Sequence, residues 1–345
     1  MRVIQWTTGN VGYRSLRAVL RHPAHELVGV FAHSPDKVGR DAAELAGLSE
    51  PTGVTATADE AALLALRPDV CVYTPLWPDV DVLCRLLAAG VNVVSTAGFI
   101  TGRAFGTGAV ARLEAAARSG RATLFGTGVN PGFANLLALV GTQLCDRVDQ
   151  IRVIESVDST GYDSGETEAS VGYGTPVESP DLPARTEAAT AVFGDAVALM
   201  GDALGIDFDR VSFDVDYAAA SARRDLGYLV LEPGTVTGID GRWRGWVGER
   251  DVVVLNFQWI KGEVADAPFT IRDGYYVEID GEPSVRLQLR VRPPRDWREP
   301  DFMGIGMIMT AMPAVNAIHA VVAAPPGIAT HATLPLVAAR GFAGG

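Results

Sequence analysis

The stretch Thr7-Thr8-Gly9-Asn10-Val11-Gly12 lies between an apolar segment, Arg2-Val3-Ile4-Gln5-Trp6, and a helical pattern over residues 13–22. A strand, a glycine turn and a helix in this order let a pyrophosphate rest on the first turn of the helix. Thr7 stands where the first glycine of the G-x-G-x-x-G pattern would be, so the pattern is incomplete. Because the turn follows a strand directly, we predict that Thr8 and residues 9–12 bind a dinucleotide.

Beyond this turn, short apolar runs alternate with helical patterns through the first third of the chain. The runs lie at residues 27–32, 69–73, 91–94 and 122–125. Near-continuous apolar strands separated by helices are typical of a parallel, doubly wound sheet. After Asn130-Pro131-Gly132 the pattern changes, and between residues 211 and 293 the hydrophobic period drops to two. A period of two indicates an antiparallel sheet with one solvated face.

These patterns predict an α/β fold with two domains. Residues 1–132 form a dinucleotide-binding Rossmann domain, which is a doubly wound parallel sheet. Residues 133–302 form an α+β domain with a largely antiparallel sheet, and we expect it to hold the substrate. The segment 303–345 is expected to pack back on the first domain.

The composition excludes several classes of partner. The chain has 345 residues, of which 48% are apolar and 20% charged, and its formal net charge is −12. No sequence-wide basic field therefore exists to bind nucleic acid or anionic lipid. Cys71, Cys84 and Cys145 are too few and too widely spaced for a zinc site or a disulfide framework, so we expect no metal.

We expect a cytoplasmic protein without a membrane span. A strand predicted from the second residue leaves no room for a signal peptide. Residues 302–339 carry no formal charge, but Pro313 and Pro325-Pro326 interrupt them. The uninterrupted piece is shorter than the roughly 20 apolar residues that a membrane helix needs. A buried or interface helix is the better interpretation.

The cofactor is predicted from the end of the second strand, where Ala32-His33-Ser34 is followed by Lys37 and Arg40. A hydroxyl and two cations without an immediate carboxylate favour the 2′-phosphate of NADP. Ser34, Lys37 and Arg40 are the predicted phosphate contacts. NAD is the alternative, because Asp36 lies close enough in the sequence to reach a ribose hydroxyl.

Ligands of a doubly wound sheet bind outside the carboxyl ends of its strands. Here these ends are rich in glycine and small hydroxyl residues, as in Thr74-Pro75, Ser95-Thr96-Ala97-Gly98 and the segment 126–132. Thr74, Pro75, Thr96, Asn130 and Pro131 are the cofactor contacts predicted there.

Candidate proton donors gather near the start of the second domain. Glu155, Tyr162, Glu166 and Tyr173 lie in or beside a polar stretch. A tyrosine or carboxylate there could give a proton to a carbonyl or imine as hydride arrives, and we predict catalytic roles for Glu155, Tyr162 and Tyr173. The alternative is an ordinary hydrophilic loop. For Glu166 and His319 we expect a place in the substrate pocket, although a core histidine is the alternative for His319.

Four motifs together resemble one family: Gly9-Asn10-Val11-Gly12, Lys37-Val38-Gly39-Arg40-Asp41, Gly126-Thr127-Gly128-Val129-Asn130-Pro131-Gly132-Phe133, and Val315-Asn316-Ala317-Ile318 with the following Ala324-Pro325-Pro326-Gly327. They resemble the dihydrodipicolinate reductase-like family that includes 2,4-diaminopentanoate dehydrogenase and native amine dehydrogenases. The resemblance covers nearly the whole chain. It implies a Rossmann domain, a homodimer formed by the second domain, and NAD(P)-linked reduction of C=N or C=O. It also implies that Thr74-Pro75 and Asn130-Pro131 lie near the nicotinamide.

The sequence departs from this family at two places. It lacks the His-rich, lysine-containing segment of true dihydrodipicolinate reductases, and the second departure concerns a glutamate. Amine-forming members carry a glutamate shortly after the strand that corresponds to residues 91–94, where it would bind and deprotonate ammonia. Residues 95–103 of this chain contain no carboxylate. The departure leaves an apolar pocket that we expect around Phe99, Ile100 and Phe133, with Thr101 beside it.

The prediction that results is an NAD(P)H-dependent oxidoreductase that reduces a small hydrophobic carbonyl or imine compound. One alternative is an amine dehydrogenase that uses Glu155 or Glu166 as an atypical catalytic carboxylate. The other is a non-catalytic NAD(P)-binding sensor, since the proton donors are weakly defined.

Overall fold

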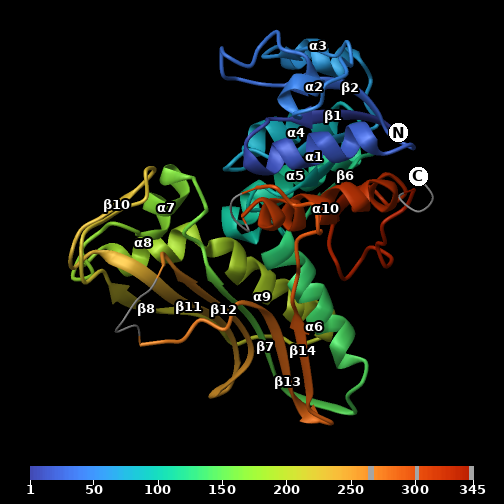
Figure 1. The fold of residues 1–345 in the computed structure, drawn as a ribbon. Coiled ribbons are helices and arrows are strands. Elements are labelled where there is room, and N and C mark those ends of the chain that lie inside the picture. Colours follow the sequence, from blue (N-terminus) through green and yellow to red (C-terminus); the bar gives the residue numbers. More distant parts are fainter. Residues whose placement is uncertain (263–267, 300–302, 342–345) are drawn as a thin grey trace. The chain divides into compact units, whose positions relative to one another are not determined.

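The structure, a computed structural model, describes residues 1–262, 268–299 and 303–341. The chain divides into two compact units, each with its own sheet (Figure 1). Unit 1 comprises Met1–Phe133 and the segment from Gly306 onward. Unit 2 comprises Ala134–Ile305.

The sheet of unit 1 has seven strands in the order β15-β6-β5-β4-β1-β2-β3, and every neighbouring pair is parallel. The strands are β1 Arg2–Trp6, β2 Glu26–Phe31, β3 Ala56–Thr57, β4 Val70–Tyr73, β5 Asn92–Ser95, β6 Thr123–Gly126 and β15 Gly327–Ala329. The order 3-2-1-4-5-6 with one added strand is that of a doubly wound nucleotide-binding sheet. The predicted Rossmann fold is confirmed.

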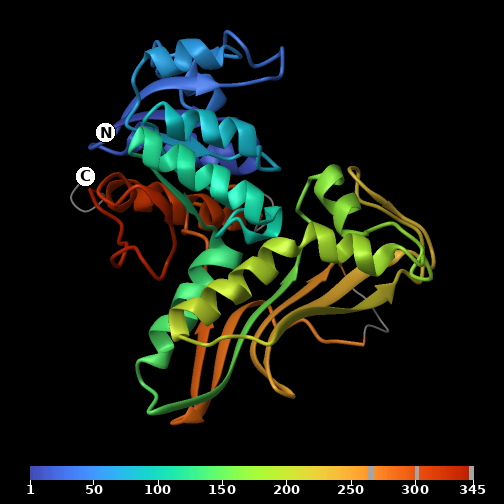
Figure 2. The same ribbon diagram turned by 180° about the vertical axis from the view of Figure 1, so that it is seen from behind.

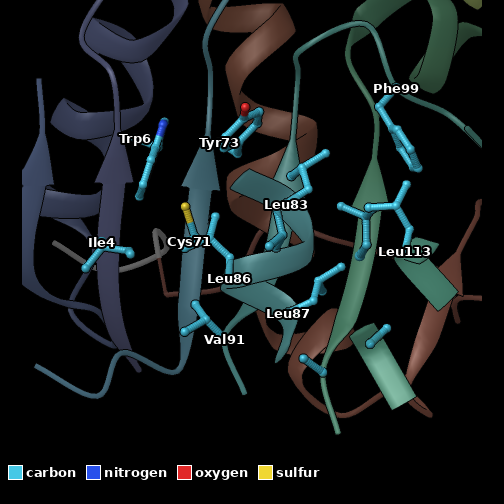
Figure 3. Close-up of a cluster of buried hydrophobic side chains, with 14 of the residues drawn as sticks. Ile4, Trp6, Cys71, Tyr73, Leu83, Leu86, Leu87, Val91, Phe99 and Leu113 are labelled. Carbon is cyan, nitrogen blue, oxygen red and sulfur yellow. The ribbon is translucent and has the colours of Figure 1, made fainter. Parts of the chain in front are cut away.

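Helices cover both faces of this sheet. They are α1 Asn10–Arg21, α2 Ala42–Leu45, α3 Glu60–Ala65, α4 Val80–Ala88, α5 Thr107–Gly120 and α10 Met303–Val322. Tyr73 of β4 packs in one core cluster with Leu83 of α4 and Leu113 of α5 (Figure 3). Its neighbour Val72 points the other way and packs with Val315 of α10. Burial on both faces explains why the strands of this sheet are mainly apolar.

Helix α10 is long and apolar enough to cross a membrane by length and composition alone. Its side chains pack instead into the second core cluster of unit 1, beside strand residues such as Val3 and Val94. The helix residues in this cluster are Ala314, Val315, Ala317, Ile318 and Val321. A core helix of this kind meets the same length and composition test, and this packing accounts for the uncharged sequence.

The sheet of unit 2 has six strands in the order β14-β13-β7-β12-β11-β8. They are β7 Arg147–Asp158, β8 Arg210–Ala219, β11 Val236–Val247, β12 Arg250–Ile260, β13 Gly274–Glu282 and β14 Val285–Leu289. Strands β7 and β12 are parallel, and the other neighbouring pairs are antiparallel. This agrees with the predicted largely antiparallel sheet.

Two helices, α6 Ala134–Thr142 and α9 Ala191–Leu204, lie across one face of this sheet (Figure 2). Trp243 of β11 points toward them, and its indole N–H donates to Thr190 Oγ1 at 3.1 Å. The adjacent Arg242 points to the opposite face, where its Nε lies 2.6 Å from Asp214 Oδ2. Polar alternation with a buried aromatic is the pattern of a sheet covered on one side.

The short elements of unit 2 form a lobe at one end of the sheet (Figure 1). They are α7 Gly165–Val171, α8 Leu182–Ala189 and the paired strands β9 Arg224–Asp225 and β10 Val230–Leu231. Helix α9 Ala191–Leu204 follows α8 directly, and the two helices meet at Thr190. The Thr190 hydroxyl donates to the carbonyl of Thr186 at 2.7 Å, a side-chain bond that competes with continued helix.

Candidate functional site

The turn between β1 and α1 adopts the conformation of a glycine turn although it begins with threonine. Thr7 has φ +69°, a left-handed backbone that favours glycine. Its N–H donates to the carbonyl of Phe31 at 3.0 Å. Further along, a Cβ at Gly12 would lie 2.5 Å from the Thr7 carbonyl oxygen, so this position admits no side chain. The pattern lacks its first glycine in sequence but keeps the backbone path.

A buried hydrogen-bond network holds Thr7 in this conformation. The Gln5 amide donates to the Thr7 carbonyl at 3.0 Å and to Thr74 Oγ1 at 2.9 Å. The Ser15 hydroxyl donates to the Gln5 carbonyl oxygen at 2.9 Å. Thr74 donates to the carbonyl of Trp6 at 3.0 Å. Thr74, predicted to contact the cofactor, therefore has a structural role under the turn, and its cofactor contact stays a prediction.

The outer side of the same turn is open. A Cβ at Gly9 would meet no atom within 4 Å, and no side chain of the N-cap residue caps the first turn of α1. Thr8 Oγ1 is buried and has no hydrogen-bond partner in the described part of the chain. A buried hydroxyl without a partner costs free energy. A pyrophosphate on the helix N-terminus would supply that partner, so these residues fit a dinucleotide.

The residues predicted to contact the ribose 2′-phosphate differ in the groups that they contact in the structure. The Lys37 ammonium donates to the Thr8 carbonyl at 3.0 Å, which places a cation beside the turn. The Arg40 guanidinium lies 2.7 Å from the carboxylate of Glu44. Ser34 is half-buried, and its carbonyl accepts from the Lys37 N–H at 2.9 Å. Of the two cations, only Lys37 reaches the turn itself.

The carboxyl ends of β5 and β6 are joined by backbone contacts. The Thr127 N–H donates to the carbonyl of Ser95 at 2.9 Å. The loop that follows, residues 128–132, is closed by a bond from the Phe133 N–H to the Gly128 carbonyl at 2.9 Å. It includes the predicted cofactor contacts Asn130 and Pro131, which are joined by a cis peptide bond. Thr96 and Pro75 lie at the same edge of the sheet, after β5 and β4.

Residues predicted to line an apolar pocket are buried in unit 1, and Phe99 belongs to its hydrophobic core. Phe99 is 2% exposed and packs in the cluster with Leu113, and its ring stacks on Phe105 at 6.1 Å (Figure 3). Ile100 and Thr101 are buried as well. Packing within unit 1 is sufficient to explain these side chains. Their place in a substrate pocket, like that of Phe133, stays a prediction.

The sequence reasoning missed a histidine at this edge. His331 follows β15, and its Nε2 lies 2.9 Å from Thr127 Oγ1. Its ring meets Phe125 edge-on at 5.0 Å between centroids, and burial lowers its pKa to about 4. The imidazole is therefore neutral at pH 7. No sequence signal marked it, because its position depends on the pairing of β15 with β6.

His319 lies at the opposite edge of the sheet, beside other histidines, and its place in a substrate pocket stays a prediction. Its ring is 5.3 Å from that of His25, which directly precedes β2, and His22 stacks on His25 at 4.0 Å. α10 carries His319 to this amino edge because the helix runs against the face of the sheet. Within residues 1–262, 268–299 and 303–341, no group of three or more His, Cys, Asp or Glu side chains is placed to hold a metal ion.

In unit 2 the structure brings Tyr162 and Tyr173 together around a buried lysine. Lys261 Nζ lies 4.8 Å from the ring of Tyr173 and 6.0 Å from that of Tyr162. It lies 2.7 Å from Glu168 Oε2 and donates to the Ser159 carbonyl at 2.8 Å. Burial lowers the pKa of Lys261 and raises those of Glu168 and both tyrosines.

This lysine had a signal in the sequence, because Lys37 and Lys261 are the only lysines of the chain. The predicted Glu166, in contrast, is exposed on α7, two residues before the buried Glu168. The two tyrosines therefore pack around the ion pair of Lys261 with Glu168, which was not predicted from the sequence.

Glu155 lies apart from this cluster. It stands on β7 opposite Tyr275 of β13, and the two side chains are hydrogen-bonded. Burial, followed by the Glu155 charge and this bond, raises the pKa of Tyr275 well above its ordinary value. A carboxylate that accepts from a phenol can exchange a proton with it or with a third group. Tyr275 was not predicted, since its partnership depends on strand register.

Comparisons with known proteins agree with this architecture. Residues 134–341 match the family model described as the 2,4-diaminopentanoate dehydrogenase C-terminal domain. A curated amine dehydrogenase of Streptomyces virginiae is 36% identical over 203 residues. That match spans 56% of this chain and 56% of the relative, so the chain aligns with little more than half of the relative's length.

Solved structures share the fold along nearly the whole chain. The amine dehydrogenase of Mycobacterium smegmatis is similar with a TM-score of 0.80 and 24% identity, over 99% of this chain and 97% of that one. The WlbA dehydrogenase of Bordetella pertussis, solved with NADH and UDP-GlcNAcA, has a TM-score of 0.53 and 16% identity. It covers 93% of this chain and 88% of its own. At these identities the likeness concerns the fold.

Proposed function

The chain belongs to the 2,4-diaminopentanoate dehydrogenase C-terminal domain family, and from this premise we propose that it is an NAD(P)-dependent oxidoreductase. Its substrate is a small, fairly hydrophobic carbonyl or imine compound. The observation that carries the proposal is the open turn at Gly9, beside the unpartnered buried hydroxyl of Thr8. The curated relative, an amine dehydrogenase, supports the same reaction class.

The chain's own residues would bind the cofactor in three places. The backbone of residues 9–12 and Thr8 Oγ1 hold the pyrophosphate, and Lys37 stands beside them for a 2′-phosphate. Asn130 and Pro131 lie at the end of β6, on the nicotinamide side of the strand order. When bound, a nicotinamide dinucleotide supplies or accepts a hydride.

The preference for NADP over NAD rests on Lys37 more than on Arg40. Arg40 is held by Glu44, and both side chains are substantially exposed, so Arg40 is a weaker candidate for the phosphate. We expect Lys37→Met to reduce affinity for NADPH more than for NADH. Arg40→Met is the matched control, because it removes a cation of the same loop that is already paired. An equal loss of affinity for NADPH and NADH in Lys37→Met would show that Lys37 stabilises the turn and does not contact the 2′-phosphate.

For the proton, we propose Glu155 with Tyr275 ahead of Tyr162 and Tyr173. Glu155 is only partly buried, and Tyr275 donates to its carboxylate, so a proton can pass between them. Tyr173 is 3% exposed and packs on Lys261, which supports a structural role for it. We expect Glu155→Gln to lower kcat at least about 100-fold, the usual size of a lost acid–base group. Tyr173→Phe is expected to affect stability more than kcat.

An amine dehydrogenase is the second candidate, favoured by the curated relative. In that reaction ammonia would add to a ketone or aldehyde, water would leave to give an imine, and a reduced nicotinamide cofactor would supply the hydride that gives the amine. A carboxylate must accept a proton from ammonium. Residues 95–103 hold no carboxylate, so Glu155 is the group we propose for this step. A reduction rate that requires ammonium would favour this candidate over simple carbonyl or imine reduction.

The decisive first experiment is a titration of the protein with NADPH and NADH. Energy transfer from tryptophan to bound nicotinamide reports binding, and Trp6 directly precedes the turn. Micromolar binding of either cofactor supports the proposal, and a panel of carbonyl compounds with and without ammonium then tests turnover. Binding without turnover would favour a sensor, and binding of neither cofactor would overturn the proposal.

A homodimer and a cytoplasmic location are also proposals, carried by the family resemblance and by the composition. Light scattering after size-exclusion chromatography tests the first. Cell fractionation tests the second. A monomer at micromolar concentration would contradict the dimer without affecting the cofactor site.

A further inference from the structure

His331 reaches the carboxyl edge of the sheet through a strand far away in the sequence. β15 pairs in parallel with β6, with Ala329 opposite Phe125, so both strands end side by side. Two residues beyond that pair, His331 and Thr127 are hydrogen-bonded at 2.9 Å. The contact joins residues 204 positions apart, and both belong to unit 1.

Thr127 lies between this histidine and the loop 128–132. It is 4% exposed, and its N–H is fixed to the carbonyl of Ser95. Its hydroxyl oxygen would lie 2.8 Å from a Cβ at Gly132, whose φ is +140°. The Thr127 side chain is thus in close contact with the end of the loop, and the position of that side chain limits the path the loop can take.

We infer that His331 is a positioning residue for the nicotinamide end of the cofactor site, acting through Thr127 on the loop 128–132. The inference rests on the proposed function and deepens it. The dinucleotide crosses the sheet at the switch point between β1 and β4, with its two halves on either side. The loop 128–132 follows β6, which lies on the β4 side of the switch point. The ADP half would bind on the β2 side and would not reach this loop. The effect of His331 should therefore be confined to the nicotinamide half.

The chemistry of the pair suits this role. The imidazole is packed against Phe125 and neutral at pH 7, so it carries one donor and one acceptor nitrogen. It can bond the hydroxyl without placing a charge beside a cationic nicotinamide ring. A lysine or a protonated histidine there would repel the oxidised cofactor.

The test separates the nicotinamide half from the ADP half of the ligand. Calorimetry measures the affinity of the wild type, His331→Phe and Thr127→Val for NAD⁺ or NADP⁺, whichever binds more tightly, and for ADP-ribose or its 2′-phosphate. We expect each variant to weaken the intact dinucleotide about three- to tenfold, as for one lost neutral hydrogen bond. Binding of the nicotinamide-free ligand should change less than about twofold.

Two further variants sharpen the result. His331→Gln keeps a hydrogen-bonding group of similar reach and should restore most of the affinity for the intact dinucleotide. His25→Phe is the matched control, a half-buried histidine of unit 1 at the opposite edge of the sheet, and should leave both ligands unaffected. The double variant His331→Phe/Thr127→Val should bind no more weakly than the poorer single variant, because both remove one interaction.

Three results would overturn the inference. Equal weakening of both ligands would make His331 structural, losses that multiply in the double variant would make the two residues independent, and unchanged affinity would remove any role. If His331→Phe fails to fold, Thr127→Val against Thr127→Ser carries the same comparison. A wild type that binds neither ligand would instead overturn the proposed function, and the inference with it.

Discussion

The two edges of the unit 1 sheet both carry half-buried histidines, but the surroundings of these histidines differ. At the carboxyl edge, His331 bonds a threonine hydroxyl, and the turn at Gly9 is open beside an unpartnered Thr8. At the amino edge, His25 lies among His22, His319 and the N-terminal amino group, which are all cations or potential cations.

The comparison shows that a lowered histidine pKa does not by itself identify a binding site. His331 and His25 both have a pKa lowered to about 4. Burial is the cause for His331, whereas for His25 burial is followed by the charges of its neighbours. A site needs open space and a directional partner in addition to a shifted pKa. In the described residues both His25 ring nitrogens are buried without a hydrogen-bond partner, whereas the His331 ring bonds Thr127.

The largest expected effect is on acid stability. A histidine whose folded pKa lies below its unfolded value of 6.5 stabilises the fold fully above that value, and the stability is lost as pH falls toward the folded pKa. For His331 the window runs from about pH 6.5 to about 4, with a loss of up to about 3 kcal/mol. Urea unfolding at several pH values should show a shallower decline in His331→Gln. An unchanged slope would mean that His331 is solvated in the folded state.

His25 sharpens this comparison because its shift also reflects neighbouring charges. Salt screens such charges, so added salt should reduce the contribution of His25 but not that of His331. The urea series for His25→Gln and His331→Gln, repeated at low and high ionic strength, checks this. Equal salt sensitivity of the two variants would contradict the difference between the edges.

The next effect tests the close approach at Gly12. Gly12→Ala places a Cβ 2.5 Å from the Thr7 carbonyl oxygen and 2.8 Å from Thr74 Oγ1, both fixed in the network. Overpacking of this kind should cost about 2 kcal/mol of unfolding free energy. Gly108→Ala on α5 is the control, because its Cβ meets nothing within 4 Å and should stabilise slightly. Similar urea midpoints for both variants would show that the turn can move.

A smaller effect separates binding from stability. Gly9→Ala has space for its Cβ in the protein itself, with φ −72°, but fills the place proposed for the pyrophosphate. We expect affinity for the cofactor to fall about tenfold, or about 1.4 kcal/mol, with little change in the urea midpoint. Fluorescence titration measures the first quantity. Wild-type affinity in Gly9→Ala would exclude the open turn as the pyrophosphate site.

The smallest effect concerns Thr7. Replacing it by glycine relieves a left-handed backbone worth about 1–2 kcal/mol, and the greater unfolded-state freedom of glycine offsets about 0.5–1 of this. We expect Thr7→Gly to gain less than about 1 kcal/mol in thermal or urea unfolding. A clear loss would show that the contact of Thr7 Oγ1 with Thr74 Oγ1 at 3.3 Å outweighs the strain.

Much of the fold was predictable because its signals are local. The run Val70–Tyr73 is apolar since both faces of the strand are covered, and alternation in β11 and β12 reflects one covered face. The glycine turn between β1 and α1 was predictable for the same reason, because a strand, a turn and a helix are adjacent in the chain. The division of α8 from α9 at Thr190 has no such local signal, since a side-chain bond rather than a proline or glycine marks it.

The candidate site was predictable only in part. Residues 9–12 lie where the sequence placed them, and Lys37 reaches the turn. The partners of the predicted proton donors were not predictable: Glu155 on β7 bonds Tyr275, whereas Tyr162 and Tyr173 pack on Lys261. Proximity along a polar stretch does not predict which strand or lobe a side chain will face.

The sequence by itself determined the alternation of strands and helices along the chain, the parallel sheet, the largely antiparallel character of the second sheet, and the turn that suits a dinucleotide. Each depends on hydrophobic period and on glycine at short range, which any window of the chain displays. The tertiary structure alone decided the pairs His331 with Thr127, Glu155 with Tyr275, and Lys261 with Glu168. These pairs depend on strand register and on contacts between residues far apart in the sequence. No local sequence pattern indicates which residues will be partners.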